Sequence, residues 1–97
     1  MTQAELLSLL RDCLVLWQVA AQVVPEDGIV VLTAPAGRFE IAAVPPDLRP
    51  ARWQLQTPAR AAAGRPARMH PSIGALLSAL RNELGGNSGN RLRVSAA

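Results

Sequence analysis

Lysine and tyrosine are absent from this chain, and cysteine and histidine occur once each. The single cysteine, Cys13, excludes an internal disulfide and any metal site built from several cysteines, which is typical of proteins from a reducing cytoplasm. The single histidine, His70, leaves little from which to build a nucleophile with its general base. We therefore predict a cytoplasmic protein with no metal, no cofactor and no catalytic residues.

Catalytic motifs and membrane segments are also missing. The sequence has no nucleophile elbow, no Walker loop, no His-Glu-x-x-His motif and no pair of acids at a telling spacing. Its longest apolar run, Cys13 to Val24, is interrupted by two glutamines and is too short to cross a bilayer. The first residues contain no basic region of the kind that opens a secretory signal. We expect neither an enzyme nor a membrane protein.

Hydrophobic residues make up 49% of the 97 positions, so the chain can build a core. Many of them are alanine, which buries little area, and a domain of this size gains stability from oligomerisation. The ten basic residues other than His70 are all arginine. Arginine favours planar, bidentate contacts with phosphate or carboxylate, although a GC-rich bacterial genome also produces arginine together with alanine and proline.

Residues Thr2 to Val24 are predicted to form a long N-terminal helix. Thr2 and Glu5 form a capping box, and Pro25 followed by Asp27-Gly28 stops the helix. The helix is apolar around most of its circumference, which is more than one sheet can cover. We therefore predict a homodimer formed through the N-terminal helix. The self-association residues are Leu6, Leu10, Leu14 and Trp17.

Three strands are predicted next. The runs Ile29 to Ala34 and Arg38 to Val44 flank the turn Pro35-Ala36-Gly37 and form a hairpin. The first run is apolar on both faces, as expected of a central strand. A third run, Ala51 to Gln56, alternates so that Trp53 and Leu55 share one face. Together these runs predict a three-stranded antiparallel sheet.

Residues 59–69 show no usable period, so we predict a mobile basic loop, with one helical turn as an option over residues 59–63. A second helix is predicted over Pro71 to Leu84. Its N-cap is either His70 or Ser72, and Gly85-Gly86 supplies its C-terminal cap.

The C-terminal residues 87–97 have two predicted states. They form either a flexible tail or, over Arg91 to Val94, an edge strand. The element order is therefore α-β-β-β-α, with a possible final β. This order predicts one small α+β domain over residues 1–97.

Charge is divided along the chain. Met1 to Asp47 contains six acids and two arginines, which gives −4, whereas the remainder contains eight arginines and one acid, which gives +7. An acid-free basic segment favours a polyanion or an acidic partner. The candidate binding residues are Arg49, Arg52, Arg60, Arg65, Arg68 and His70.

Two functions compete for this pattern. The first is a non-enzymatic interaction module, of the adaptor, chaperone or inhibitor type, that self-associates and docks an unknown protein partner. The second is nucleic-acid binding through the segment Arg49 to Arg68. Trp53, beside Arg52, can stack on bases, although its alternation favours a place in the core. A third interpretation has the arginines only solvating a loop and pairing with acids. Those acids are Glu26, Asp27, Glu40 and Asp47.

Overall fold

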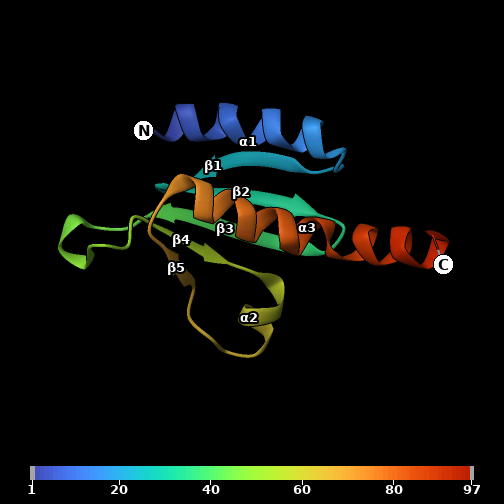
Figure 1. Cartoon of the computed structure of the whole chain (residues 1–97). Coiled ribbons are helices and arrows are strands. Elements are labelled where there is room, and N and C mark those ends of the chain that lie inside the picture. The colour runs from blue at the N-terminus through green and yellow to red at the C-terminus, as the bar shows by residue number, and fades with distance from the viewer. Residues whose placement is uncertain (1, 97) are drawn as a thin grey trace.

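The computed structural model describes residues 2–96, with the surroundings of side chains given for residues 2–84. Over these residues the chain is α+β, with three α-helices, one short 3-10 helix and a five-stranded antiparallel sheet (Figure 1). The elements are α1 (Gln3–Trp17), β1 (Gln22–Glu26), β2 (Ile29–Ala34), β3 (Gly37–Ala43), η1 (Pro46–Leu48), β4 (Trp53–Gln56), α2 (Pro58–Ala62), β5 (Arg68–His70) and α3 (Ile73–Ala96). The predicted N-terminal helix, antiparallel sheet and α+β class are confirmed, whereas the prediction of three strands is wrong.

The sheet is a meander in which each strand pairs with the next one along the chain. One of its faces is covered by two helices: α1 lies against β1 and β2, and α3 lies against β4 and β5. Figure 1 shows that the two helices run in the same direction, so that both N-termini lie at the same end of the sheet. The core between helices and sheet consists of Leu6, Leu10, Leu14, Val23, Val30, Leu32, Phe39, Ile41, Leu55, Leu76, Leu80 and Leu84.

The predicted helix over Thr2–Val24 is too long. Its capping box is present, but it ends at Trp17, because Gln18 takes a left-handed φ of 58° and donates its backbone N–H to the carbonyls of the last turn. Gln22–Glu26 form the edge strand β1 instead. Asp27 and Gly28 both have positive φ, which is the geometry of a two-residue hairpin turn between β1 and β2, not of a helix stop.

The segment predicted as a basic loop contains two elements. Thr57 caps α2 by accepting the N–H of Arg60, with Pro58 at the first helical position, and β5 pairs with β4. The mobility of residues 59–69 stays a prediction.

The second predicted helix continues beyond its predicted end. Ser72, one of the two predicted caps, accepts the N–H of Ala75 at 3.1 Å, and α3 then runs to Ala96 through Gly85-Gly86. Glycine takes helical dihedrals at a cost of about 1 kcal/mol, so a glycine pair permits a helix end without forcing one. The backbone of Arg91–Val94 is helical, and the predicted edge strand is wrong. Flexibility of residues 87–97 stays a prediction, and Ala97 lies outside the described residues.

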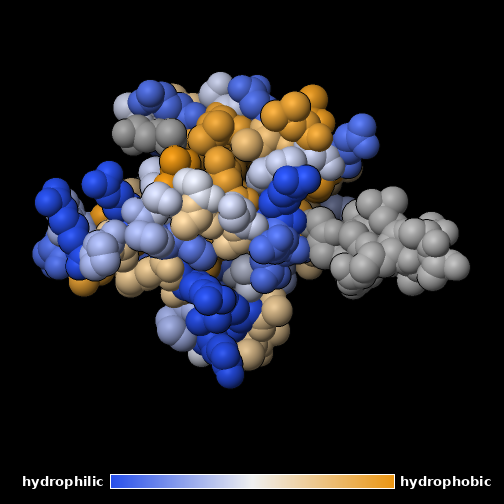
Figure 2. All heavy atoms as spheres, viewed as in Figure 1, coloured by the Kyte–Doolittle hydropathy of each residue, from blue (hydrophilic) through white to orange (hydrophobic). Residues whose placement is uncertain are grey.

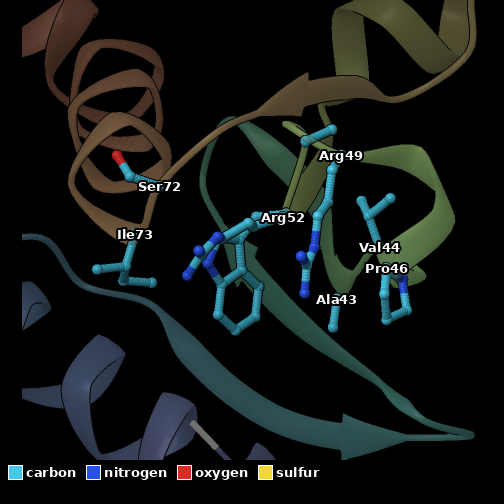
Figure 3. Close-up of a pocket in the computed structure, with 9 residues that line it drawn as sticks. Ala43, Val44, Pro46, Arg49, Arg52, Ser72 and Ile73 are labelled. Carbon is cyan, nitrogen blue, oxygen red and sulfur yellow. The ribbon is translucent and has the colours of Figure 1, made fainter.

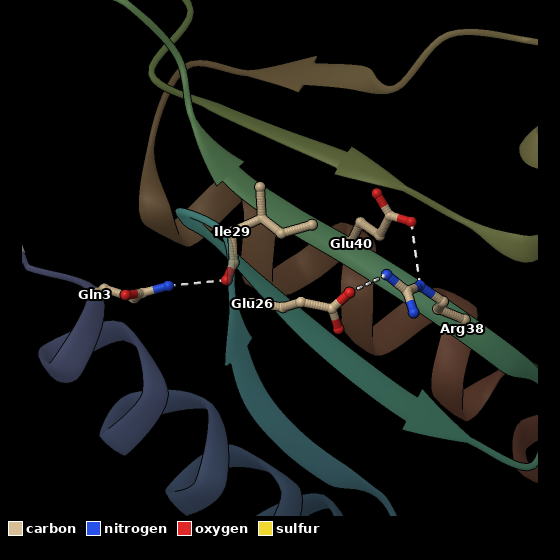
Figure 4. A network of polar contacts seen from close by, with 5 residues as sticks. All are labelled: Gln3, Glu26, Ile29, Arg38 and Glu40. Atoms are coloured by element: carbon tan, nitrogen blue, oxygen red, sulfur yellow. Dashed lines mark hydrogen bonds and ion pairs between the residues drawn. The ribbon is translucent and has the colours of Figure 1, made fainter.

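The face of the sheet opposite the helices carries a polar network. Arg38 on β3 donates hydrogen bonds to Glu26 on β1 at 3.3 Å and to Glu40 at 3.2 Å (Figure 4). These bonds, the one with Glu26 contributing most, raise the pKa of Arg38. Because β2 lies between β1 and β3, the Arg38–Glu26 pair spans Val31 in the middle of β2. This explains why Val31 is only 2% exposed on a face that α1 and α3 do not cover.

No helix among the described residues is long and apolar enough to cross a membrane.

Candidate functional site

One end of the sheet brings together residues from the middle and the last third of the chain. In register across the strands, Ala43 at the end of β3 pairs with Trp53 at the start of β4, which pairs with His70 at the end of β5. Residues 44 to 52 connect β3 to β4 and project from this end of the sheet, and α3 begins there immediately after Ser72 (Figure 1). The backbone N–H of Arg52 donates to the carbonyl of His70 at 2.9 Å, and this bond brings the end of that connection close to the start of α3.

A pocket of about 510 Å³ lies at this end of the sheet (Figure 3). Figure 3 shows Arg52 reaching toward Ser72 and Ile73 at the start of α3, and Arg49 reaching toward Ala43, so the two guanidinium groups flank the pocket. A second, more open depression adjoins it, lined by both arginines, Pro50, Pro71 and Ser72. The residues that line the 510 Å³ pocket are Ala43, Val44, Pro46, Arg49, Ala51, Arg52, Trp53, Ser72 and Ile73.

The two arginines of this pocket have no acidic partner among the described residues. The only ion pairs among the residues whose side chains the structure describes join Arg38 to Glu26 and Glu40. If the arginines of the basic segment only solvate a loop, they should pair with acids that include Glu26 and Glu40. Both of these acids instead pair with Arg38. The positive charges of Arg49 and Arg52 are left uncompensated at short range, and the N-terminal end of α3 adds partial positive charge beside them.

The other three predicted arginines lie elsewhere. Arg60 belongs to α2, Arg65 follows it, and Arg68 begins β5, so all three are toward the far end of β4 from the pocket. Arg60 Nε donates to the carbonyl of Pro66 at 3.0 Å, and Gln56 Nε2 donates to the carbonyl of Arg65 at 2.8 Å. These bonds hold the shape of the α2–β5 connection. The structure therefore divides the predicted basic site into two groups.

His70, which was predicted to belong to the basic binding surface, is buried and does not contribute to that surface. Its side chain is 9% exposed, and Nε2 is buried without a hydrogen-bond partner among the described residues. Burial lowers the pKa of His70 below its ordinary value of 6.5, and the positive charge of Arg68 lowers it further. At neutral pH the imidazole is therefore neutral and adds no charge to the basic surface.

The predicted self-association residues are used within the chain. Leu6, Leu10 and Leu14 are buried against the sheet, and Trp17 is half-buried against the same core. A second copy cannot contact these leucines while α1 stays in place.

The apolar residues that α1 leaves exposed are neighbours in its last turn. Val15 is 77% exposed and Leu16 is 79% exposed. Figure 2 shows apolar atoms gathered between α1 and α3 on the helix-covered side of the molecule.

Sequence reasoning found Arg49, Arg52 and Trp53 but not the space between them. The small side chains of Ala43 and Ala51 leave that space beside the indole, and Ser72 and Ile73 close it from α3. The pairing of strands brings these four residues together, and no local sequence pattern indicates that they are close.

We searched for a metal site among the described residues and for related proteins, and found neither. Among the described residues, no group of three or more His, Cys, Asp or Glu side chains is placed to hold a metal ion. Comparison with known proteins found no family model, no curated protein and no solved structure that matches this chain.

Proposed function

We propose that this protein is a non-enzymatic binding module whose ligand is a nucleic acid held by Arg49 and Arg52. The observation that carries the proposal is a pocket flanked by two guanidinium groups that form no ion pair among the described residues. Guanidinium groups bind phosphate through paired, charge-assisted hydrogen bonds, and an open pocket leaves them accessible to it.

The second group of arginines supports a polymeric ligand over a small anion. Arg60, Arg65 and Arg68 lie toward the other end of β4, and the extended segment from Arg52 to Thr57, which includes β4, is about 17 Å long at roughly 3.3 Å per residue. Phosphates of one DNA strand succeed one another at about 3.4 Å along the axis, so about six nucleotides span both groups. A single small anion reaches only one of them.

The reactive side chains support a binding role over catalysis. Burial raises the pKa of Cys13, and the charge of Asp12 raises it further, so little thiolate forms at neutral pH. The hydroxyl of Ser72 accepts the N–H of Ala75 and thereby caps α3. His70 is buried and neutral. These groups serve the fold.

The test is fluorescence anisotropy with labelled single- and double-stranded oligonucleotides, titrated from about 50 to 200 mM salt. We expect affinity that falls with salt. In the double variant Arg49→Gln/Arg52→Gln, the slope of log affinity against log salt should decrease by about two, because two phosphate contacts are lost.

The matched control is Arg38→Gln/Arg81→Gln, which changes net charge equally but leaves the pocket intact. It should retain most of the binding, and circular dichroism should show that both double variants are folded. Absence of binding at the lowest salt, or equal weakening by both double variants, would contradict the proposal.

Self-association through α1 is the second candidate function, and the exposed pair Val15 and Leu16 favours it. Leu9, Cys13 and Leu16 follow one another at helical spacing on a flank of α1 beside its buried face, and Leu9 and Cys13 are half-buried. A second copy that covers this flank would bury it. This surface differs from the predicted one, whose leucines are in the core.

Light scattering coupled to size exclusion tests the second candidate. We expect a dimer for the natural chain and a monomer for Leu16→Glu, because a charge cannot be buried unpaired in an apolar contact. Leu48→Glu, which changes another exposed leucine away from α1, is the control and should stay dimeric. A natural chain that is monomeric at all concentrations rules out this candidate.

A further inference from the structure

We propose that the nucleic acid is single-stranded and that one of its bases enters the pocket and stacks on Trp53. This inference rests on the proposed function, because it names the form of the ligand that the same arginines hold.

The surroundings of Trp53 provide the first argument. Its indole lies in the row Ala43–Trp53–His70 across the sheet, and its neighbour in β3 is one of the smallest side chains. Trp53 lines the 510 Å³ pocket and also a smaller cavity of about 180 Å³ that reaches toward Gln3 at the start of α1. The indole packs against the hydrophobic core, yet it borders two cavities and is half-buried, not buried. Part of its surface is therefore accessible from the pocket.

The composition of the pocket provides the second argument. Six of its nine lining residues are apolar, and the polar ones are Arg49, Arg52 and Ser72. Phosphate alone needs no apolar wall, whereas a base has a flat, weakly polar face that stacks on aromatic rings. Mainly apolar walls with a few placed polar groups, in a volume of roughly 300–1,000 Å³, are typical of sites for small organic groups.

The position of the arginines allows one ligand to place its phosphates outside the pocket and a base inside it. Arg49 and Arg52 line both the pocket and the open depression outside it. A strand whose backbone follows the depression can hold its phosphates there while one base turns inward to Trp53. The bases of a duplex are paired and stacked, and taking one out of the stack costs free energy, so a single strand meets this geometry more easily.

Intrinsic fluorescence provides a direct test, because the chain has only two tryptophans. In Trp17→Phe, Trp53 is the only tryptophan, so selective excitation of tryptophan reports on it alone. A single-stranded oligonucleotide of about twelve bases, within the usual range of site sizes, should quench its emission. The same oligonucleotide with abasic positions throughout should bind without quenching, since it retains phosphates but has no base to stack.

Affinity of the natural chain supplies a second measurement that needs no variant. The abasic oligonucleotide should bind about 5- to 150-fold more weakly than the intact one, which corresponds to one stacked base. The duplex should also bind more weakly than the intact single strand.

The outcomes separate the two proposals. Equal affinity for intact and abasic strands with unchanged Trp53 emission, or tighter binding of the duplex, overturns the inference and leaves the proposed function standing. Absence of binding to all three oligonucleotides at low salt overturns both.

Discussion

His70 occupies a buried position on β5, and its Nε2 atom has no hydrogen-bond partner among the described residues. Burying a polar group in this way costs free energy, and protonation would add a buried charge beside Arg68. The same residue pairs in register with Trp53, the indole of the candidate pocket. The side chain whose protonation is disfavoured therefore lies directly beside Trp53 on the neighbouring strand.

The first prediction concerns the pH dependence of stability. Burial holds the pKa of His70 below its ordinary 6.5, so the unfolded chain binds a proton at a pH where the folded chain does not. Stability should therefore be highest above about pH 6.5 and fall as the pH decreases through the folded pKa. Urea unfolding of the natural chain and of His70→Leu checks this. The variant should lack the decrease in this window, and an equal decrease in both proteins would assign it to other groups.

Gly37 begins β3 with a φ of 130°, and a Cβ atom added there would lie 2.7 Å from Cγ of Pro58 in α2. Both the dihedral and the contact oppose a larger side chain. This glycine allows α2 to approach the β2–β3 turn.

The second prediction follows from this contact. Gly37→Ala should reduce the free energy of unfolding by about 1–3 kcal/mol, because a strained dihedral and a steric contact are added together. Gly74→Ala is the control: an added Cβ in the first turn of α3 meets only Ser72 Oγ at 3.9 Å. It should be neutral or stabilising by up to about 1 kcal/mol, the difference in helix propensity. Similar losses in both variants would contradict the assignment.

At the scale of elements, α1 has an inner and an outer side with different roles. Leu10 is fully buried against the sheet, whereas Leu16 lies on the solvent side. The inner side stabilises the chain, and the outer side is free to contact a partner.

The third prediction compares these two leucines. Leu10→Ala should lower the free energy of unfolding by about 2–5 kcal/mol through lost burial and a cavity. Leu16→Ala should change it by less than about 0.5 kcal/mol, as is usual for exposed positions. Chemical denaturation of both variants checks the difference, provided that both are measured in the same oligomeric state. A large loss in Leu16→Ala would mean that the outer side is covered.

The edge strand β1 shows how an exposed sheet edge is protected. The two-residue turn at Asp27 and Gly28 fixes which backbone groups of β1 face outward, and residues 23 and 25 are among them. Residue 25 is a proline, which has no N–H to offer, and the carbonyl of Val23 accepts a bond from Arg11 at 3.2 Å. Both features discourage pairing of this edge with another chain.

At the scale of the whole molecule, the fold changes the meaning of the charge pattern. Along the sequence the acidic half precedes the basic half, and two of the acids pair within their own half, with Arg38 on the face of the sheet opposite the helices. The arginines from residue 49 to residue 68 lie in two groups toward opposite ends of β4. The proposed nucleic-acid binding and the proposed self-association involve different surfaces, since the first would use the start of α3 and the second the flank of α1 that carries Leu16. The salt titration and the light-scattering experiment can therefore succeed or fail independently.

Several features follow from the sequence alone because their physical causes are local. The capping box of Thr2 and Glu5, the hairpin over residues 29–43 and the alternation of Trp53 and Leu55 depend on neighbours within a few residues. Thr57-Pro58 is also a local helix-start signal, and α2 agrees with the helical turn offered as an option over residues 59–63. Asp27-Gly28 is a local hairpin signal, so the interpretation of these residues as a helix stop is wrong.

Tertiary structure alone decided the remaining features. A short, largely apolar stretch such as residues 19–24 suits a helix or a strand equally, and pairing with β2 selected a strand that begins at Gln22. Pairing of β5 with β4 turned part of a basic segment into an edge strand and buried His70. The pocket exists because register places Ala43 beside Trp53 and α3 begins next to Arg52. Register and helix docking depend on contacts between residues far apart in the chain, and these contacts leave no short-range pattern in the sequence.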